Sequence, residues 1–222
     1  MKIAVDGASA TGKSTVCAEV SKRLDILHLD TGAMYRVAGL KAHLLGLDTG
    51  ADAIGKSVDI LLKNLDIDIK YIDGRQREFL DGEDVSLRIR EHHISKLASD
   101  ISAVPTLRAF MVDLQREIAA KQPCILDGRD IGTYVLPNAE YKFFLTAELE
   151  CRAKRRYSEL IARGQNADFD KIKEDIRQRD YNDSNRAFAP LKKADGAVEI
   201  DSTKMTVDEV VALMLKVVGH NV

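Results

Sequence analysis

Short runs of apolar residues alternate along this chain with longer segments in which apolar residues recur every three or four positions. The runs predict β-strands, and the longer spacing predicts amphipathic α-helices. Strands that alternate with helices are typical of a parallel sheet covered by helices. We expect the strands at residues 2–5, 26–29, 124–126, 141–145 and 198–200.

Three helices have clear patterns. The first follows a glycine-rich turn and places Val16, Val20 and Leu24 on one face. A second is expected over residues 34–45. The last is expected to begin at Thr206, because Thr206 and Glu209 have the spacing of a capping box, and an apolar stripe follows them.

Two segments depart from this alternation. Residues 66–86 alternate strictly between apolar and polar, with Asp-Gly pairs at 73–74 and 81–82, which predicts a small antiparallel meander. Residues 147–180 are rich in charge and poor in apolar residues. We expect them to form two exposed helices joined near residues 164–166, as a mobile flap over the sheet.

Composition narrows the class of protein. The 222 residues suit one α/β domain with inserted lobes, and 45% hydrophobic residues suffice for a core. A net charge of −2 gives no sign of a nucleic-acid or membrane partner, and no apolar run has transmembrane length. Three scattered cysteines without a CxxC pair predict neither a disulfide framework nor a zinc site, and favour thiols in a reducing cytoplasm.

A phosphate-binding loop lies between the first strand and the first helix. Residues 7–14 match G-x-x-x-x-G-K-[ST] at every fixed position. The glycines let backbone N–H groups face phosphate oxygens, Lys13 supplies a full positive charge, and the Ser14 hydroxyl suits Mg²⁺. This motif alone does not separate a kinase from a GTPase, a motor or a switch. The predicted ATP site comprises Gly7, Ala8, Ser9, Ala10, Thr11, Gly12, Lys13, Ser14 and Thr15.

Three further segments combine arginine with aspartate, namely DTGAMYR at 30–36, DGRDIGT at 127–133 and RDYNDSNR within 179–186. Two follow predicted strands, where open α/β sheets bind ligands. Arginine binds phosphate with two hydrogen bonds, and aspartate accepts from hydroxyls and amines. Each segment alone is equally consistent with a solvated ion pair. The three together, beside a phosphate loop, favour a binding site for a second phosphorylated substrate.

With FLDGEDVS, LDGRDIGTYVLPNA and KFFLTAELECRAKRR, these segments make the chain resemble the bacterial-type cytidylate kinases nearly end to end. The resemblance implies the P-loop NTPase three-layer fold. It also implies ATP-dependent phosphorylation of CMP and dCMP with Mg²⁺ as cofactor. The implied parts are a core of residues 1–34, 96–147 and 188–222, a monophosphate-binding lobe near 35–95, and a helical lid near 148–187.

The resemblance also implies roles for individual residues. The acceptor phosphate would be bound by Arg36, Arg129 and Arg186. Cytosine would be read by Ser99, Arg108 and Asp130, and the ribose would be bound by Asp183. Basic residues in or beside the lid would reach the transferring phosphoryl group, from among Arg152, Arg155, Arg156 and Arg179. Thr31 stands where the family often has serine, which keeps the hydroxyl.

The cytosine assignment is chemically consistent. A carboxylate accepts from the exocyclic amine of cytosine but faces an oxygen in uracil, and an unpaired buried acceptor costs about 1–3 kcal/mol. We therefore expect CMP to be preferred over UMP at least tenfold. The alternative roles for Asp130 are an ion pair with Arg129 or a helix cap.

The expected chemistry needs no general base, because the attacking phosphate oxygen is already an anion, and no histidine is expected near these motifs. Positioning and charge stabilisation would suffice. Ser14 and Asp127 are expected to hold Mg²⁺, and Asp127 is expected to do so through a water molecule. The alternative for Asp127 is a loop cap.

Two rival functions stay open at this point. The first is a kinase of the same fold that acts on UMP, AMP or shikimate. The second is a nucleotide-dependent switch, against which the chain has no N-K-x-D guanine-reading motif. We expect small-molecule partners only, and a monomer by default.

Overall fold

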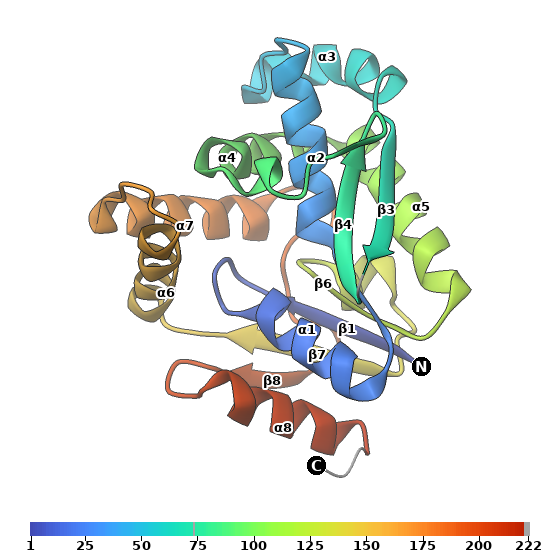
Figure 1. The fold of residues 1–222 in the computed structure, drawn as a ribbon, viewed down its shortest axis with the longest axis vertical. Helices are drawn as coiled ribbons and strands as arrows, with labels where there is room; N and C mark the ends of the chain where they lie inside the picture. The colour runs from blue at the N-terminus through green and yellow to red at the C-terminus, as the bar shows by residue number, and fades with distance from the viewer. Residues whose placement is uncertain (73, 220–222) are drawn as a thin grey trace. The chain divides into compact units, whose positions relative to one another are not determined.

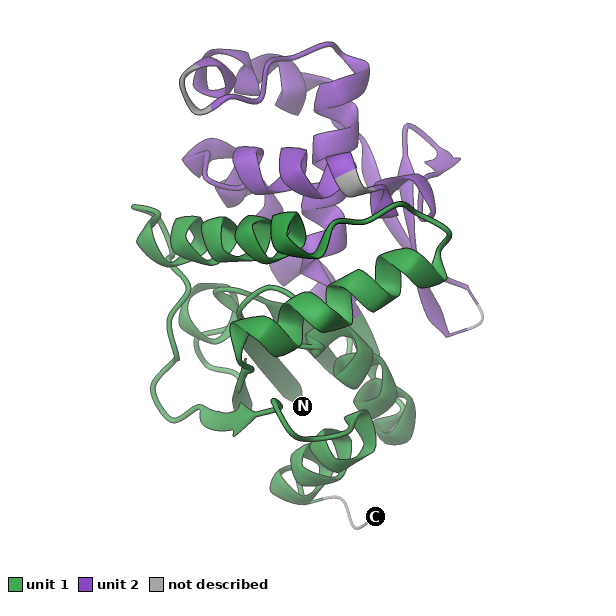
Figure 2. Ribbon diagram, turned by 90° about the vertical axis from the view of Figure 1, so that its left-hand side faces the viewer, with its two compact units in different colours: residues 1–28, 122–222 green, residues 29–121 purple. Residues whose placement is uncertain are grey.

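The computed structural model describes residues 1–72 and 74–219, without the side chains of 51, 52 and 92. It divides into two compact units, coloured separately in Figure 2. Unit 1 comprises Met1–His28 and Gln122–Val222, and unit 2 comprises Leu29–Lys121. The expected division into core, monophosphate-binding lobe and lid is a functional one and stays a prediction.

Unit 1 is built on a parallel sheet (Figure 1). The five strands follow the order β2-β6-β1-β7-β8, which confirms the strands predicted from the apolar runs. Most extend past the apolar run because polar residues continue the pairing, as Asp6 does opposite Gly128. Their bounds are β1 (Lys2–Gly7), β2 (Leu27–Asp30), β6 (Cys124–Gly128), β7 (Tyr141–Thr146) and β8 (Val198–Asp201).

Two helices pack together on this sheet, α1 (Lys13–Leu24) and α8 (Val207–Val217). Val16 and Val20 of α1 are buried in one apolar cluster with residues of the strands and of α8. The capping box predicted for α8 is present, since Thr206 accepts from the Glu209 N–H and the Glu209 carboxylate accepts from the Thr206 N–H. The hydrophobic periodicity therefore located both helices correctly.

The charged segment forms two helices, as expected. These are α6 (Leu149–Ala162) and α7 (Phe169–Asn185), and they share a small apolar core of Ala153, Leu160, Ile172 and Ile176. Helix α7 continues five residues beyond the predicted limit of 180, so that Asp183 lies on it. Between β6 and β7, residues Ile131–Val135 form a turn of π-helix that the sequence pattern did not predict.

Unit 2 contains the predicted meander, an antiparallel sheet in the order β3-β4-β5. The first Asp-Gly turn includes residue 73, which lies outside the described residues. At the second turn, Asp81 and Gly82 both have positive φ, as a tight hairpin turn requires. The unit comprises α2 (Thr31–Leu44), α3 (Ala51–Lys63), β3 (Ile67–Ile72), β4 (Arg75–Leu80), β5 (Glu83–Asp84), η1 (Arg88–Arg90), α4 (His92–Ile101) and α5 (Pro105–Lys121).

Helix α2 begins at Thr31, three residues before the start that the apolar pattern predicted. The cause is Asp30, whose carboxylate accepts from the Ala33 N–H at 3.0 Å and so caps the helix. Among the helices of residues 1–72 and 74–219, none is both long enough and apolar enough to span a lipid bilayer.

Candidate active site

The phosphate loop joins β1 to α1 in unit 1, as the motif predicts. Gly7 has φ +150°, and a Cβ there would lie 2.1 Å from the Leu145 carbonyl oxygen, so only glycine fits. Gly12 has φ +93°, a left-handed conformation that glycine adopts without strain. The loop therefore packs closely against β7 and leads directly into the N-terminus of α1, the positive end of the helix dipole.

Lys13 lies inside this loop. Its Nζ donates to the Ala8 carbonyl oxygen at 2.6 Å and to the Thr11 hydroxyl at 3.1 Å. Burial, and then the positive charge of Arg129, lower the pKa of Lys13 to about 7. Bound phosphate would supply the negative charge that restores the ammonium form, so the loop is suited to polyphosphate.

Asp127 lies on β6 and contacts residues of both α1 and β2. Its Oδ2 accepts from the Ser14 hydroxyl at 2.8 Å, and its Oδ1 lies 2.6 Å from His28 Nε2. The serine and carboxylate oxygens, so close together, fit the oxygen ligands of Mg²⁺. The expectation that no histidine lies near the motifs is wrong, because β2 places His28 directly beside Asp127.

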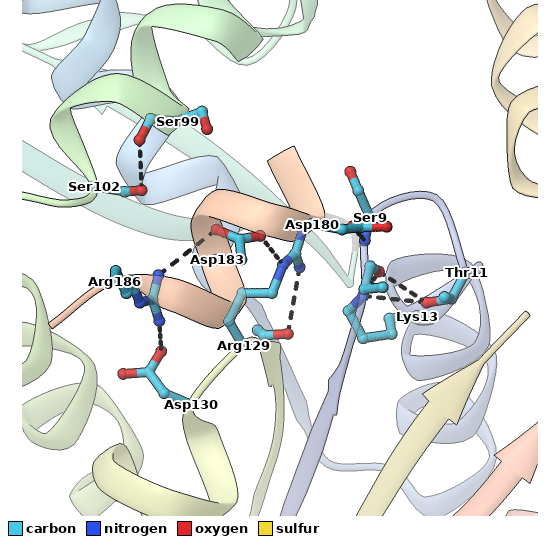
Figure 3. Close-up of polar contacts among 12 residues, drawn as sticks. Ser9, Thr11, Lys13, Ser99, Ser102, Arg129, Asp130, Asp180, Asp183 and Arg186 are labelled. Atoms are coloured by element: carbon cyan, nitrogen blue, oxygen red, sulfur yellow. Dashed lines mark hydrogen bonds and ion pairs between the residues drawn. The ribbon is translucent and has the colours of Figure 1, made fainter. Parts of the chain in front are cut away.

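A chain of ion pairs connects the second and third arginine motifs (Figure 3). Arg129 donates through Nε to Asp183 at 2.7 Å. Arg186 lies 3.8 Å from Asp183 and donates to Asp130 at 3.2 Å. Asp130 and Asp183 are buried, and the side chains of Arg129 and Arg186 are 18% and 7% exposed. The carboxylates thus hold two guanidinium groups close together, and guanidinium groups are suited to binding an anion such as phosphate.

The pKa values agree with tight pairing in this cluster. Burial alone would raise the pKa of Asp183, but the charges of Arg129, Arg179 and Arg186 hold it below the usual range. Burial acts against the charged form of Arg129, yet Asp183 raises its pKa. The partner of Asp130 is Arg186 rather than Arg129, so the alternative ion pair considered for Asp130 is not the one observed.

Helix α6 contributes two arginines to the phosphate loop. Arg152 donates to the Ser9 carbonyl oxygen at 3.0 Å and forms an ion pair with Asp180, which in turn accepts from the Ser9 N–H. Arg155 donates to the Thr11 carbonyl oxygen at 3.3 Å and to Ser202. Arg156 instead pairs with Glu159 along its own helix, so the structure does not bring it to the loop.

Asp6 fixes the turn that carries Arg129 and Asp130. Its two carboxylate oxygens accept from the backbone N–H groups of Ile131 and Gly132, both at 2.7 Å. The residue is 2% exposed, and burial raises its pKa to about 6 against the opposing effect of the two N–H groups. Sequence analysis missed Asp6, although its position directly before Gly7 and after an apolar strand was the available signal.

This burial gives a testable pH dependence. Between pH 3.8 and about 6, folded Asp6 holds a proton that the unfolded chain has released. The excess stability of the wild type over Asp6→Asn should therefore fall as the pH rises through this window, by about 3 kcal/mol at most. Urea unfolding of both proteins from about pH 4 to about pH 7 measures the difference.

The control is Asp208→Asn, because Asp208 has a side chain that is 87% exposed in the same unit. Its difference from the wild type should change little over the same range. An Asp6→Asn difference that is flat, or that grows with pH, would contradict the raised pKa of Asp6.

Unit 2 contains the first arginine motif. Arg36 donates to Asp30 Oδ2 at 2.9 Å, and Arg90 lies 3.5 Å from the same oxygen. The Asp30 carboxylate thus caps α2 and holds two guanidinium groups together. Sequence analysis proposed Arg36 but missed Arg90, which stands in a 3₁₀ turn between β5 and α4 with no motif around it.

Arg108 and Ser99 also lie in unit 2. Arg108 is 1% exposed, donates to the Ser102 carbonyl oxygen at 3.1 Å, and stacks on Tyr35 with its guanidinium carbon 5.6 Å from the ring centre. The Ser99 carbonyl oxygen accepts from the Ser102 hydroxyl. Ser99 of α4 and Arg108 of α5 therefore both contact Ser102, which follows α4, and Tyr35 orients the arginine.

The chain is similar to known cytidylate kinases along its whole length. The family model described as cytidylate kinase matches residues 3–220. The chain is 45% identical over 226 residues to the cytidylate kinase of Caldicellulosiruptor saccharolyticus, covering 100% of this chain and 99% of that protein. It is also 45% identical to that of Lactobacillus johnsonii, with 98% and 94% covered.

Among solved structures, an uncharacterized protein from Eubacterium ventriosum superposes with a TM-score of 0.51 at 13% identity, covering 99% of this chain and 98% of that one. At this level of identity the likeness concerns the fold alone.

Proposed function

This chain belongs to the cytidylate kinase family and phosphorylates CMP, and we propose that the residues described above bind ATP·Mg²⁺ and the acceptor. The observation that carries the assignment of residues is the chain of ion pairs from Asp130 through Arg186 and Asp183 to Arg129, which lies in the same unit as the phosphate loop. dCMP is proposed as a second acceptor.

The donor is proposed to bind in the phosphate loop of unit 1, comprising Gly7, Ala8, Ser9, Ala10, Thr11, Gly12, Lys13, Ser14 and Thr15. Lys13 would leave the Ala8 carbonyl oxygen and bind the β- and γ-phosphates. Ser14 and Asp127 would hold Mg²⁺, which neutralises charge on the transferring phosphoryl group when it is bound. The short Ser14–Asp127 distance of 2.8 Å supports this pair.

The acceptor phosphate is proposed to bind Arg129, Arg186 and Arg36. Each guanidinium is paired with a carboxylate that holds it in place, Asp183, Asp130 and Asp30 respectively. Asp183 would also accept from the ribose hydroxyl. Preorganised arginines bind phosphate without losing further side-chain freedom, which favours this arrangement.

The cytosine ring is proposed to be read by Asp130, Ser99 and Arg108. Asp130 is 5% exposed and has one carboxylate oxygen directed to Arg186, so the carboxylate is held in a fixed orientation. A fixed, buried acceptor discriminates strongly between an amine and a carbonyl. Arg108 would donate to the ring through a guanidinium that Tyr35 holds.

The transfer itself needs alignment and positive charge, because the CMP phosphate is already a nucleophile. Lys13, Arg129 and Arg186 would stabilise charge on the transferring group. Arg152 and Arg179 would add to it from α6 and α7, and Arg156 would have to leave Glu159 to take part. We further propose that the protein is a cytoplasmic monomer, since its substrates are cytosolic small molecules.

The test of the acceptor is ADP release from ATP·Mg²⁺, run in parallel with CMP, dCMP, UMP, AMP and shikimate. CMP and dCMP should turn over fastest, and the ratio of kcat/KM for CMP to that for UMP should fall at least tenfold in Asp130→Ala, since the unpaired acceptor is then removed. Equal turnover of UMP in the wild type would refute the base-reading assignment.

Arg36→Ala is the matched control, because Arg36 contacts phosphate in this proposal but is paired with Asp30 and not with Asp130. It should lower kcat/KM for CMP and UMP by a similar factor. An Asp130→Ala variant that loses activity on both acceptors equally would mean that Asp130 acts only through Arg186.

A further inference from the structure

Three side chains with different donor atoms meet beneath the phosphate loop, namely Cys17 of α1, His28 of β2 and Asp127 of β6. Their Sγ, imidazole nitrogen and carboxylate oxygen all lie within 4.8 Å of one another. All three residues belong to unit 1. Cys17 and Asp127 are buried, and the His28 side chain is 15% exposed.

This donor set is unlike that of a magnesium site. Magnesium takes oxygen ligands in an octahedron, whereas thiolate and imidazole favour a borderline transition metal, of which Zn²⁺ is the commonest in proteins. Three protein ligands with one open position are also typical of tetrahedral zinc. Tetrahedral bonds of the usual lengths place ligand atoms roughly 3.3–3.8 Å apart, so movements on the order of 1 Å would complete the site.

The surroundings are consistent with a divalent ion of this kind. A thiolate and a carboxylate balance the two charges of Zn²⁺, so the buried site would be neutral overall. Lys13 acts electrostatically on both Cys17 and Asp127. Since its Nζ is directed to the Ala8 carbonyl oxygen, Lys13 is held by hydrogen bonds on the loop itself.

We propose that Cys17, His28 and Asp127 form a binding site for Zn²⁺ or a similar transition metal. A metal on Oδ1, the Asp127 oxygen beside His28, places a divalent cation on the carboxylate whose Oδ2 faces Ser14. Repulsion between the two cations opposes Mg²⁺ binding there, which makes the metal an inhibitor. This second step rests on the proposed role of Asp127. The spacing of cysteines along the sequence predicted no zinc site, because the ligands come from three separate segments of the chain.

The site is tested by Zn²⁺ binding to the full-length protein without nucleotide, measured by competition with a chromogenic chelator. The wild type should bind one equivalent, and Co²⁺ in its place should give a thiolate-to-metal charge-transfer band. Replacing a residue that only hydrogen-bonds to a metal ligand typically lowers metal affinity 10- to 100-fold. Replacing a ligand itself, as in Cys17→Ser and His28→Gln, should therefore weaken Zn²⁺ binding at least tenfold. Glutamine keeps a donor for Asp127 and preserves its hydrogen bond.

Cys124→Ser is the matched control, because Cys124 is also fully buried but is absent from the cluster. Circular dichroism establishes that each variant folds. Equal binding by all four proteins, a loss confined to one of the two ligand variants, or no charge-transfer band would each overturn the site.

Inhibition is measured separately, as the Zn²⁺ concentration that halves CMP phosphorylation at fixed Mg²⁺. This concentration should be at least tenfold higher for Cys17→Ser than for the wild type, with each rate expressed as a fraction of the same protein's rate without Zn²⁺. Tight Zn²⁺ binding without inhibition would overturn the link to Mg²⁺. Failure of the wild type to phosphorylate CMP with Mg²⁺ present and Zn²⁺ absent would refute the assigned activity instead.

Discussion

Lys13→Met is expected to lower kcat for CMP phosphorylation by about 100- to 1,000-fold, the loss seen when one preorganised group that stabilises transition-state charge is removed. Lys13 is the buried lysine of the phosphate loop, and its Nζ lies 2.6 Å from a loop carbonyl oxygen. Methionine keeps the length of the side chain and removes the charge. The loop should therefore keep its shape, so the loss should appear in kcat more than in folding.

The measurement is ADP release at saturating CMP and ATP·Mg²⁺, with ATP affinity measured separately by calorimetry. Lys22→Met is the control, because Lys22 is an exposed lysine in the last turn of the same helix. It should leave kcat within about twofold, as surface substitutions away from special features usually do. A Lys13→Met enzyme with unchanged kcat would show that residues other than Lys13 neutralise the charge of the transferring phosphoryl group.

The pattern of apolar residues was sufficient for the sheet and for most helices, because burial in a parallel sheet requires continuous apolar runs. It set strand ends too early wherever a polar residue continues the pairing, as at Asp6 and Asp127. It also began α2 too late, because a cap depends on the single residue Asp30 rather than on periodicity. The π-helical turn after Asp130 has no periodic signature, and its N–H groups depend on a carboxylate from another strand.

The sequence motifs identified most residues of the candidate site but did not predict which residues form hydrogen bonds and ion pairs with one another. The RDYNDSNR motif singled out Asp183 and Arg186, but only the fold shows that Asp183 accepts from Arg129, 54 residues away in sequence. His28 looked like an ordinary residue of a short strand, and its contact with Asp127 depends on sheet order. The pairing of Arg156 with Glu159, by contrast, follows a helical spacing visible in the sequence.

Asp183→Ala is expected to lower the free energy of unfolding by about 3–5 kcal/mol, because it leaves the largely buried guanidinium group of Arg129 without its carboxylate and removes one of the two carboxylates beside Arg186. Asp183 is 5% exposed and lies 2.7 Å from Arg129 and 3.8 Å from Arg186. The lost ribose contact and the displaced arginines should also reduce kcat/KM for CMP. Urea unfolding measures the first effect, and the ADP-release assay at subsaturating CMP measures the second.

Two variants separate this charge effect from general damage to α7. Asp170→Ala removes an exposed carboxylate from the first turn of the same helix and should cost at most about 1 kcal/mol. Asp183→Asn keeps an acceptor for Arg129 but not the charge, so its loss should be intermediate. Because the pKa of Asp183 is held below 3.8, the advantage of the wild type over Asp183→Asn should persist above that pH and shrink below it. If Asp183→Ala unfolds like Asp170→Ala, the buried arginines are stabilised by other groups and the ion-pair chain does not hold the site together.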